Sequence, residues 1–325
     1  MSKEWLLANH YIIQTLPMTR KQSLSALFSI SAVVPVYQCA ERFSRHLDAL
    51  EAFSRKVREL IWVITHSEDG SHRLAFEAAN RLGGKVIEAP RGLYQAWNTG
   101  IAAAEGDFIY MSTIGDTIGE VGLTRLAGIL ETTKADLVIS PPEIYPATYQ
   151  HRSVTAHWPL FRFSDVLAPY ALRRIPRPHA MLMQILAGAS SLAGSCASCL
   201  FRTSVVRNRP FPTDYHHYGD TAWMYLNLPG VDLAYCPEKV ARFWIHDPKI
   251  HRVVDKKQIY SLSTELSAHL PGEEQELVRR LVDSSIYIDA YRGQSPFCPW
   301  WLFPDAWRSR WIRDQIQAQL TRKLF

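Results

Sequence analysis

The chain has 325 residues, of which 47% are hydrophobic and 21% charged, so it can bury a large core and wholesale disorder is not expected. Its formal net charge of +5 allows a basic face for phosphates or anionic lipid, but it is too mild to indicate nucleic-acid binding. The 5 cysteines, an odd number at irregular spacing, argue against a disulfide framework and favour a reducing compartment.

Regular patterning begins near residue 29, where short apolar runs alternate with stretches whose apolar residues recur every three or four positions. The runs predict strands at 30–37, 60–64, 86–87, 108–111 and 137–140, and the stretches between them predict helices. Such alternation is typical of an α/β fold, a Rossmann-like and mostly parallel sheet with helices on both faces. Ligands of these sheets bind beyond the carboxyl ends of the strands.

The alternation stops after residue 140, and a stretch rich in proline, aromatic residues and arginine follows. Further along, the pattern predicts helices at 182–193 and from Asp220, and strands at 199–202, 231–235 and 240–244. The chain is accordingly divided into an N-terminal extension at 1–28, two halves at 29–140 and 141–250, and a helical C-terminal region at 251–325.

Four short motifs stand in order on the predicted elements of the first half. They are PVYQ at 35–38, ITHSEDGS at 64–71, GLYQAWNTGI at 92–101 and AEGDFI at 104–109. Each motif is weak alone, but the ordered set resembles the nucleotide-binding half of family 2 glycosyltransferases, which have the A-type (GT-A) fold. The resemblance implies a sugar-nucleotide-dependent transferase, with 29–140 as the nucleotide-sugar-binding half and 141–250 as the acceptor-binding half.

The resemblance also implies where a nucleoside-diphosphate sugar donor would bind. The predicted donor-binding residues are Pro35, Tyr37, Thr65, Asp69, Arg91 and Asn98. The residue types suit the task, because an aromatic ring offers a base a flat partner, a carboxylate accepts hydrogen bonds from ribose hydroxyls, and a guanidinium binds phosphate at two points. For Tyr37 and Asp69 taken singly, a turn-forming role is an equal alternative, since Asp-Gly is a strong turn signal.

The predicted cation site departs from the family pattern. Family members usually carry Asp-x-Asp-Asp after the fourth strand, whereas this chain has Thr-Ile-Gly-Asp at 113–116 and keeps only Asp116. A hard cation such as Mg²⁺ or Mn²⁺ takes several oxygen ligands from phosphates and water. The resemblance therefore implies a divalent cation held by Asp116 and by His246, with loss of the metal site, or a surface position of His246 beside Asp247, as the alternatives.

The catalytic prediction rests on residues 217–223, HYGDTAW, which resemble the family's Glu-Asp motif with Gly219 where Glu is common. The resemblance implies that Asp220 takes the proton from an acceptor hydroxyl, on a saccharide or another molecule, so that the reaction inverts the anomeric centre. A helix N-cap is the alternative role for Asp220. A catalytically degenerate protein that only binds sugar nucleotides is the alternative function.

Other classes of protein fit less well. A nucleotidyltransferase needs a glycine-rich, lysine-bearing loop after the first strand, and a dinucleotide dehydrogenase needs G-x-G-x-x-G, but 38–42 contain no glycine. Cys196 and Cys199 form a single C-x-x-C without the second ligand pair of a zinc site. Arg173, Arg174 and Arg177 are further phosphate or acceptor candidates, and for each of them, as for Arg91, a solvated face is the alternative.

The expected location is cytoplasmic. No apolar run approaches the roughly 20 residues of a membrane span, and no secretory signal is evident. The C-terminal tail at 300–323 combines tryptophans with arginines, which suits peripheral contact with a membrane interface. A helix packed back on the domain would have the same composition, and both explanations stay open.

Overall fold

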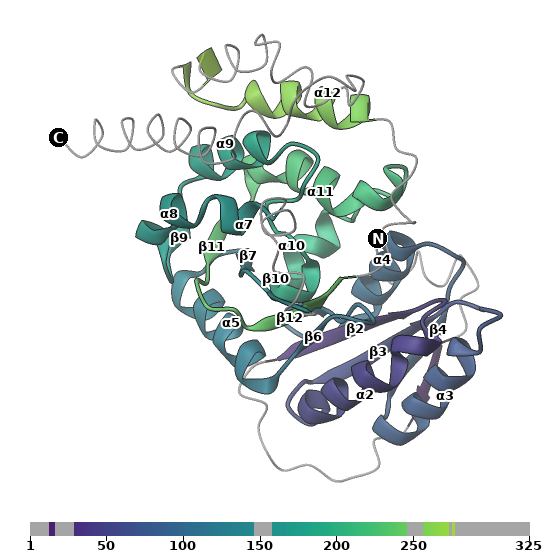
Figure 1. The fold of residues 1–325 in the computed structure, drawn as a ribbon. Coiled ribbons are helices and arrows are strands. Elements are labelled where there is room, and N and C mark those ends of the chain that lie inside the picture. The colour runs from purple at the N-terminus through teal and green to yellow at the C-terminus, as the bar shows by residue number, and fades with distance from the viewer. Residues whose placement is uncertain (1–12, 17–28, 146–157, 246–255, 273–274, 277–325) are drawn as a thin grey trace.

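The computed structural model describes residues 13–16, 29–145, 158–245, 256–272 and 275–276 (Figure 1). Its centre is a 9-stranded sheet with helices on both faces. In order across the sheet, the strands are β1 (Ile13–Leu16), β4 (Gly84–Glu88), β3 (Glu59–Ile64), β2 (Ile30–Val36), β5 (Phe108–Met111), β10 (Cys199–Arg202), β7 (Leu137–Ile139), β11 (Leu233–Tyr235) and β9 (Arg174–Ile175).

The α/β prediction is confirmed, because β4, β3, β2 and β5 are parallel neighbours and helices connect them. The rest of the sheet is mixed. β10 runs antiparallel between β5 and β7, and β11 lies parallel to β7. The strand β1, from the predicted N-terminal extension, adds an antiparallel edge to β4. Both predicted halves therefore contribute to one sheet.

A second, 3-stranded sheet lies beyond the carboxyl end of β5. It is formed by β6 (Thr117–Ile118), β12 (Ala241–Trp244) and β8 (Glu143–Tyr145). Because β6 follows β5 after a short loop and β12 pairs with β6, residues near 116 and residues near 244 are brought together.

The helices form two layers over two apolar cores (Figure 1). One layer contains α2 (Ala40–Ser54), α3 (Ser71–Leu82) and α5 (Glu120–Thr133). The other contains α4 (Leu93–Ala103), α9 (Arg177–Ala187), α10 (Thr203–Asn208), α11 (Gly219–Asn227) and α12 (Lys256–Ser267). Alternate side chains of β2 serve the two cores: Ala32 and Val34 pack toward α2, and Val33 packs toward α4.

Short helices complete the second half of the chain. They are α7 (Pro159–Arg162), α8 (Ser164–Leu167) and the 3₁₀ turns η2 (Ala168–Tyr170), η3 (Cys196–Ser198), η4 (His216–Tyr218) and η5 (Leu228–Gly230). The C-terminal helix α12 packs against α9 and α11, and it buries Leu262 and Leu266 in the core on that side. Among the described residues, no helix is both long enough and apolar enough to cross a membrane. The tryptophan-rich tail at 300–323 lies outside the described residues.

The helix predicted at 182–193 is displaced in the structure. It begins at Arg177 and ends at Ala187, where Gly188 adopts a φ of +66°. Proline in the first turn favours this start, and a glycine with positive φ is a common helix end. Residues 188–195 consequently form a loop that leads into η3, and this loop contributes several serines to the site described below.

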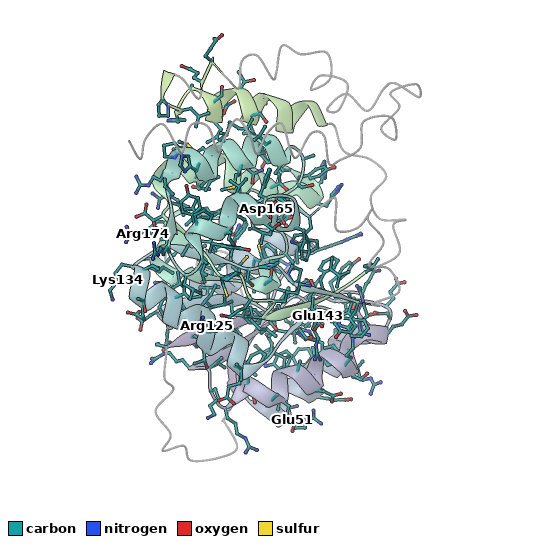
Figure 2. All side chains as sticks on the ribbon, turned by 60° about the vertical axis from the view of Figure 1, so that its left-hand side comes forward. Glu51, Arg125, Lys134, Glu143, Asp165 and Arg174 are labelled. Atoms are coloured by element: carbon teal, nitrogen blue, oxygen red, sulfur yellow. The ribbon has the colours of Figure 1, made fainter. Side chains whose placement is uncertain are left out.

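Most ion pairs of the described residues are exposed to solvent, and Figure 2 labels some of their members, among them Arg125 and Arg174. Arg125 forms a two-point ion pair with Glu238, and Arg174 and Arg177 both bind Asp232 at the β9 edge of the sheet. Because exposed pairs of this kind contribute at most about 1 kcal/mol, they do not explain the fold. They do engage Arg174 and Arg177 away from the cavity, which weakens their candidacy for the active site.

Candidate active site

Three predicted donor-binding residues gather where parallel strands end. Tyr37 follows β2, Thr65 follows β3, and Arg91 lies three residues beyond β4. The guanidinium carbon of Arg91 is 5.1 Å from the centroid of the Tyr37 ring, which is a cation–π contact. Thr65 donates its hydroxyl to the Ala89 carbonyl at 3.1 Å and so fastens the two turns. The arrangement presents an aromatic ring and a cation side by side at the carboxyl edge of the sheet.

Asp69 links the turn after β3 to the start of α2. One carboxylate oxygen accepts from the Ala40 backbone at 2.9 Å, and the other accepts from the Ser71 backbone at 3.0 Å and the Ser71 hydroxyl at 2.7 Å. Desolvation opposes ionisation, but the hydrogen bonds together outweigh it and lower the pKa of Asp69 to about 2. The side chain thus already holds the loop together, while the residue remains exposed to solvent.

Two of the predicted donor contacts are placed differently. Pro35 is buried inside β2, paired in register with Val63, so it shapes the strand before the Tyr37 turn. Asn98 lies on α4 with both amide atoms engaged: Nδ2 donates to the Phe211 carbonyl at 2.8 Å, and Oδ1 accepts from the Phe211 backbone at 2.9 Å. This pairing gives Asn98 a structural role in the described fold, and its predicted contact with the donor stays a prediction.

Asp116 lies in the loop between β5 and β6 and is only 5% exposed. Its Oδ1 accepts from the Trp244 backbone at 3.2 Å, and its Oδ2 accepts from the Ser195 hydroxyl at 3.1 Å. Burial raises the pKa of Asp116 to about 7, although the bond from Trp244 opposes the shift. Among the described residues, no three His, Cys, Asp or Glu side chains cluster as a ready metal site. His246 lies outside the described residues.

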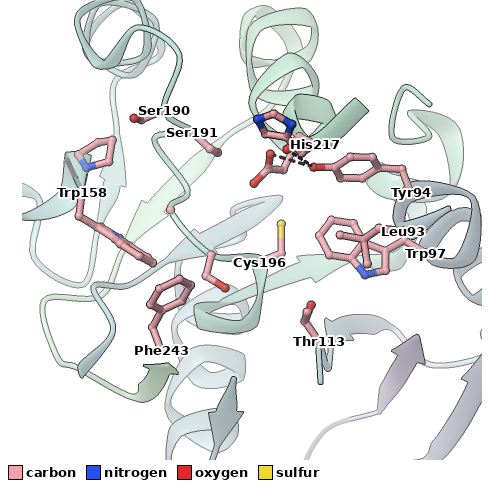
Figure 3. Close-up of a pocket in the computed structure, with 14 residues that line it drawn as sticks. Leu93, Tyr94, Trp97, Thr113, Trp158, Ser190, Ser191, Cys196, His217 and Phe243 are labelled. Atoms are coloured by element: carbon pink, nitrogen blue, oxygen red, sulfur yellow. Dashed lines mark hydrogen bonds between the residues drawn. The ribbon is translucent and has the colours of Figure 1, made fainter. Parts of the chain in front are cut away.

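A cavity of about 330 Å³ opens beside these turns, beyond the end of β5 (Figure 3). Leu93, Tyr94 and Trp97 of α4 form one side, and Trp158 and Phe243 form the opposite side. The loop at 190–196, together with Thr113, His217 and Asp220, completes the lining. Its volume is at the lower end of the range for small-molecule sites, and aromatic walls with a few polar groups are typical of such sites.

Asp220 supplies the carboxylate of this cavity from the first turn of α11. Its Oδ1 lies 2.8 Å from the Thr221 backbone nitrogen and 3.2 Å from the Tyr94 hydroxyl. The Tyr94 hydroxyl also lies 2.9 Å from the His217 carbonyl oxygen. Burial raises the pKa of Asp220 to about 6, although the hydrogen bonds from Thr221 and Tyr94 oppose the shift. A carboxylate with a pKa near neutrality, facing a cavity, has the properties required of a general base.

Gly219 allows this arrangement. A Cβ at this position would lie 2.5 Å from two carbons of the Tyr94 ring and 2.7 Å from the Pro212 carbonyl oxygen. The glycine that replaces the family's usual glutamate therefore makes room for the Tyr94 ring, which in turn bonds Asp220.

Residues 31–206 match the model of the family described as glycosyl transferase family 2. The chain belongs to this family. As a family 2 member it is a glycosyltransferase, and its activity is glycosyl transfer from a sugar nucleotide. No curated protein sequence matches it significantly.

Two structures of S. aureus TarS show the same fold at low sequence identity. Residues 1–349 of S. aureus TarS in complex with UDP-GlcNAc superpose with a TM-score of 0.58 at 12% identity, covering 82% of this chain and 73% of that chain. The UDP complex of the same protein gives 0.56 at 14% identity, covering 82% and 72%. Glucosyl-3-phosphoglycerate synthase from Mycobacterium tuberculosis, with Mn²⁺, UDP and phosphoglyceric acid, gives 0.48 at 15%, covering 79% and 87%.

For this glycosyltransferase, the sequence reasoning missed most of the cavity. Tyr94 and Trp97 lie within a recognised motif, and their spacing of three on a helix places them on one face, which is a usable signal. Trp158 and the serines at 190, 191 and 195 come from segments without any matching motif. Their proximity to Asp220 depends on the fold alone.

Proposed function

We propose that the chain is an inverting glycosyltransferase in which Asp220 deprotonates the acceptor hydroxyl. The observation that carries the proposal is the Asp220 carboxylate, with its pKa raised to about 6, facing a cavity at the carboxyl edge of the sheet. As the acceptor hydroxyl loses its proton to Asp220, its oxygen attacks the anomeric carbon from the side opposite the leaving diphosphate. A single displacement of this kind inverts the configuration at that carbon.

For the donor, we propose that the base and ribose of a nucleoside-diphosphate sugar lie against Tyr37 and the 65–69 turn. The Tyr37 ring gives the base a flat partner, and Arg91 beside it is a cation within reach of phosphate oxygens. Arg91 forms no ion pair with a described acidic residue, so its charge is available to a ligand. Because β2 and β5 are adjacent and parallel, the diphosphate would continue from Tyr37 toward Thr113 and Asp116.

For the cation, Asp116 and His246 remain the proposed ligands. The Trp244 backbone bond to Asp116 supports this pair, because it places the chain two residues before His246 beside the carboxylate. The two Asp116 oxygens each accept one hydrogen bond and keep further lone pairs for a hard cation. A divalent cation there would neutralise the charge that develops on the leaving diphosphate.

One observation favours the alternative of a degenerate sugar-nucleotide-binding protein. Asp116 is the single carboxylate left in the 113–116 segment, and it is nearly buried. The two functions are distinguished by incubating the protein with UDP-sugars and other nucleotide sugars, with and without Mn²⁺, and measuring release of nucleoside diphosphate. NMR of the product reports the configuration at the anomeric carbon. Sugar transfer, or slow hydrolysis of the donor, with inversion at this carbon supports the proposal that the chain is an active enzyme. Nucleotide binding with no hydrolysis or transfer under any condition supports the degenerate protein, and a retained configuration would contradict the role of Asp220.

A further inference from the structure

The cavity beside Asp220 has an unusual electrostatic character for an enzyme that handles phosphorylated donors. Among the described residues that line it, none is a lysine or an arginine, and the ionisable groups are Tyr94, Cys196, His217 and Asp220. Burial raises the pKa of the Cys196 thiol well above its usual range, so the thiol is protonated at neutral pH. At the Trp158–Phe243 end of the cavity, away from the proposed diphosphate position near Thr113, a phosphate or carboxylate would lose its hydration without gaining a cationic partner from the described lining.

The side of the cavity away from α4 presents aromatic surface. The rings of Trp158 and Phe243 meet edge to face, with centroids 4.7 Å apart and an angle of 71° between their planes. Gly194, with a φ of +68°, permits the close approach of the 190–196 loop, since a Cβ there would overlap the Trp158 indole. The Trp158 ring is thus held between β12 and this loop. A pyranose ring carries an apolar C–H face that can pack on such a surface.

The lining also contains hydrogen-bonding groups with no partner among the described residues. These are the indole nitrogens of Trp97 and Trp158 and the hydroxyl of Ser191. Trp97 is 3% exposed and Ser191 is 5% exposed, so these groups are withdrawn from bulk solvent. These three atoms are covered by protein, so they offer no contact to a ligand inside the cavity. The polar side chains left for a ligand are the neutral ones of Thr113, Ser190 and Ser195, together with His217 and Asp220.

From these observations we infer that the Trp158–Phe243 end of the cavity binds an uncharged saccharide unit of the acceptor, one that carries neither phosphate nor carboxylate. The inference rests on the proposed function, in which Asp220 at the centre of the same cavity takes the proton from the acceptor hydroxyl. It narrows that function, since the aromatic faces, and a described lining that contains no lysine or arginine, favour hydroxyl-bearing neutral rings over sugar phosphates and uronic acids.

Direct binding tests this inference without requiring turnover. The full chain, saturated with UDP, is mixed with a panel of neutral methyl hexosides, N-acetylhexosaminides and disaccharides, and with the 6-phosphates and uronic acids of the same sugars. Saturation-transfer NMR then reports which ligands contact the protein. We expect transfer to at least one neutral glycoside, with binding of its charged counterpart at least about tenfold weaker. Preference for the charged counterparts, or no transfer to any neutral glycoside, would overturn the inference.

Substitutions locate the binding. Trp158→Ala should weaken the neutral glycoside at least about tenfold, and Trp158→Phe, which keeps an aromatic ring but removes the N–H, should weaken it less. Phe161→Ala is the matched control, because Phe161 belongs to the neighbouring helix α7 and does not line the cavity. Circular dichroism and UDP affinity monitor folding. If Trp158→Phe and Trp158→Ala both bind the glycoside as tightly as the unsubstituted chain, the assignment to this end of the cavity is wrong.

The two proposals can fail separately. A neutral glycoside that binds at Trp158 in a protein that never hydrolyses or transfers any donor would contradict the proposed function and leave the saccharide site standing. Efficient transfer to a phosphorylated or uronic acceptor, unaffected by Trp158→Ala, would contradict the neutral-saccharide site and leave the proposed function standing.

Discussion

Replacing Asp220 by asparagine should lower the turnover rate and raise the stability of the fold. This combination is expected if Asp220 is a buried general base. Asparagine keeps the size of the side chain and an oxygen that can accept from Thr221 and Tyr94, at positions now 2.8 and 3.2 Å from Asp220 Oδ1. It cannot take a proton at neutral pH. Turnover should therefore fall by roughly a hundred- to ten-thousand-fold, as for other general bases, while nucleotide affinity stays within about twofold.

The same substitution should stabilise the fold, and the size of the gain follows from the pKa. Burial raises the Asp220 pKa from 3.8 to about 6, and a shift of about two units corresponds to about 3 kcal/mol. The folded protein prefers the protonated form, so stability is lost as the pH rises from about 4 through 6, and the ionised carboxylate is a cost above that range. Asparagine removes the cost but also gives up a favourable charge at the start of α11, about 1 kcal/mol at most.

The net gain at pH 8 is then about 2 kcal/mol, or roughly 3–6 °C in melting temperature, and the desolvation contribution should shrink by about half at pH 5. Calorimetric melting of both proteins at the two pH values, with kcat measured in parallel, makes the comparison. Near-normal turnover would remove Asp220 from the mechanism. Destabilisation at pH 8 would show that the carboxylate acts mainly as a structural cap, and an equal gain at both pH values would refute the raised pKa.

Four further outcomes follow from the site. Tyr37→Ala should weaken nucleoside diphosphate binding about tenfold or more in calorimetry, because the flat partner of the base is lost. Tyr94→Phe removes a hydrogen bond that lowers the Asp220 pKa, so the acid limb of the kcat profile should move to higher pH. Asp116→Asn should abolish any dependence of donor affinity on Mn²⁺, whereas unchanged dependence would place the cation elsewhere. Asn98→Ala breaks two buried hydrogen bonds and should lower the melting temperature while leaving nucleotide affinity unaltered.

The pH profile of the unsubstituted enzyme is a related check on the base. The titratable groups that face Asp220 are Tyr94, Cys196 and His217, and burial keeps the first two protonated at neutral pH. We expect activity to rise as Asp220 ionises near pH 6. In Asp220→Asn this limb should disappear from the residual rate, and its persistence would assign the titration to another group.

The extent to which the sequence predicted the fold depended on the range of the interactions. Strands at 30–36, 59–64 and 108–111 and the helices between them follow from apolar periodicity, which is local, and the structure confirms them. The prediction of a helix at 182–193 is wrong in its bounds, because leucine and alanine residues continue past Gly188 in the sequence. In the structure Gly188 has a positive φ, and the helix ends before it, at Ala187. The antiparallel entry of β10 between β5 and β7 pairs residues far apart in the chain, and periodicity carries no information on such partners.

For the site, residue identity and residue position were decided at different levels. The ordered motifs alone were enough to indicate a family 2 glycosyltransferase, and they placed Tyr37, Thr65 and Arg91 after successive strands, because parallel strands end at a common edge. Only the tertiary structure showed that the Asn98 side chain forms hydrogen bonds with the Phe211 backbone. It alone also showed that Trp158, the 190–196 loop and Asp220 line one cavity. It also decided the pKa of Asp220, since an aspartate in sequence has no burial. Desolvation and proximity are properties of packed neighbours, and those neighbours come from parts of the chain that no local pattern connects.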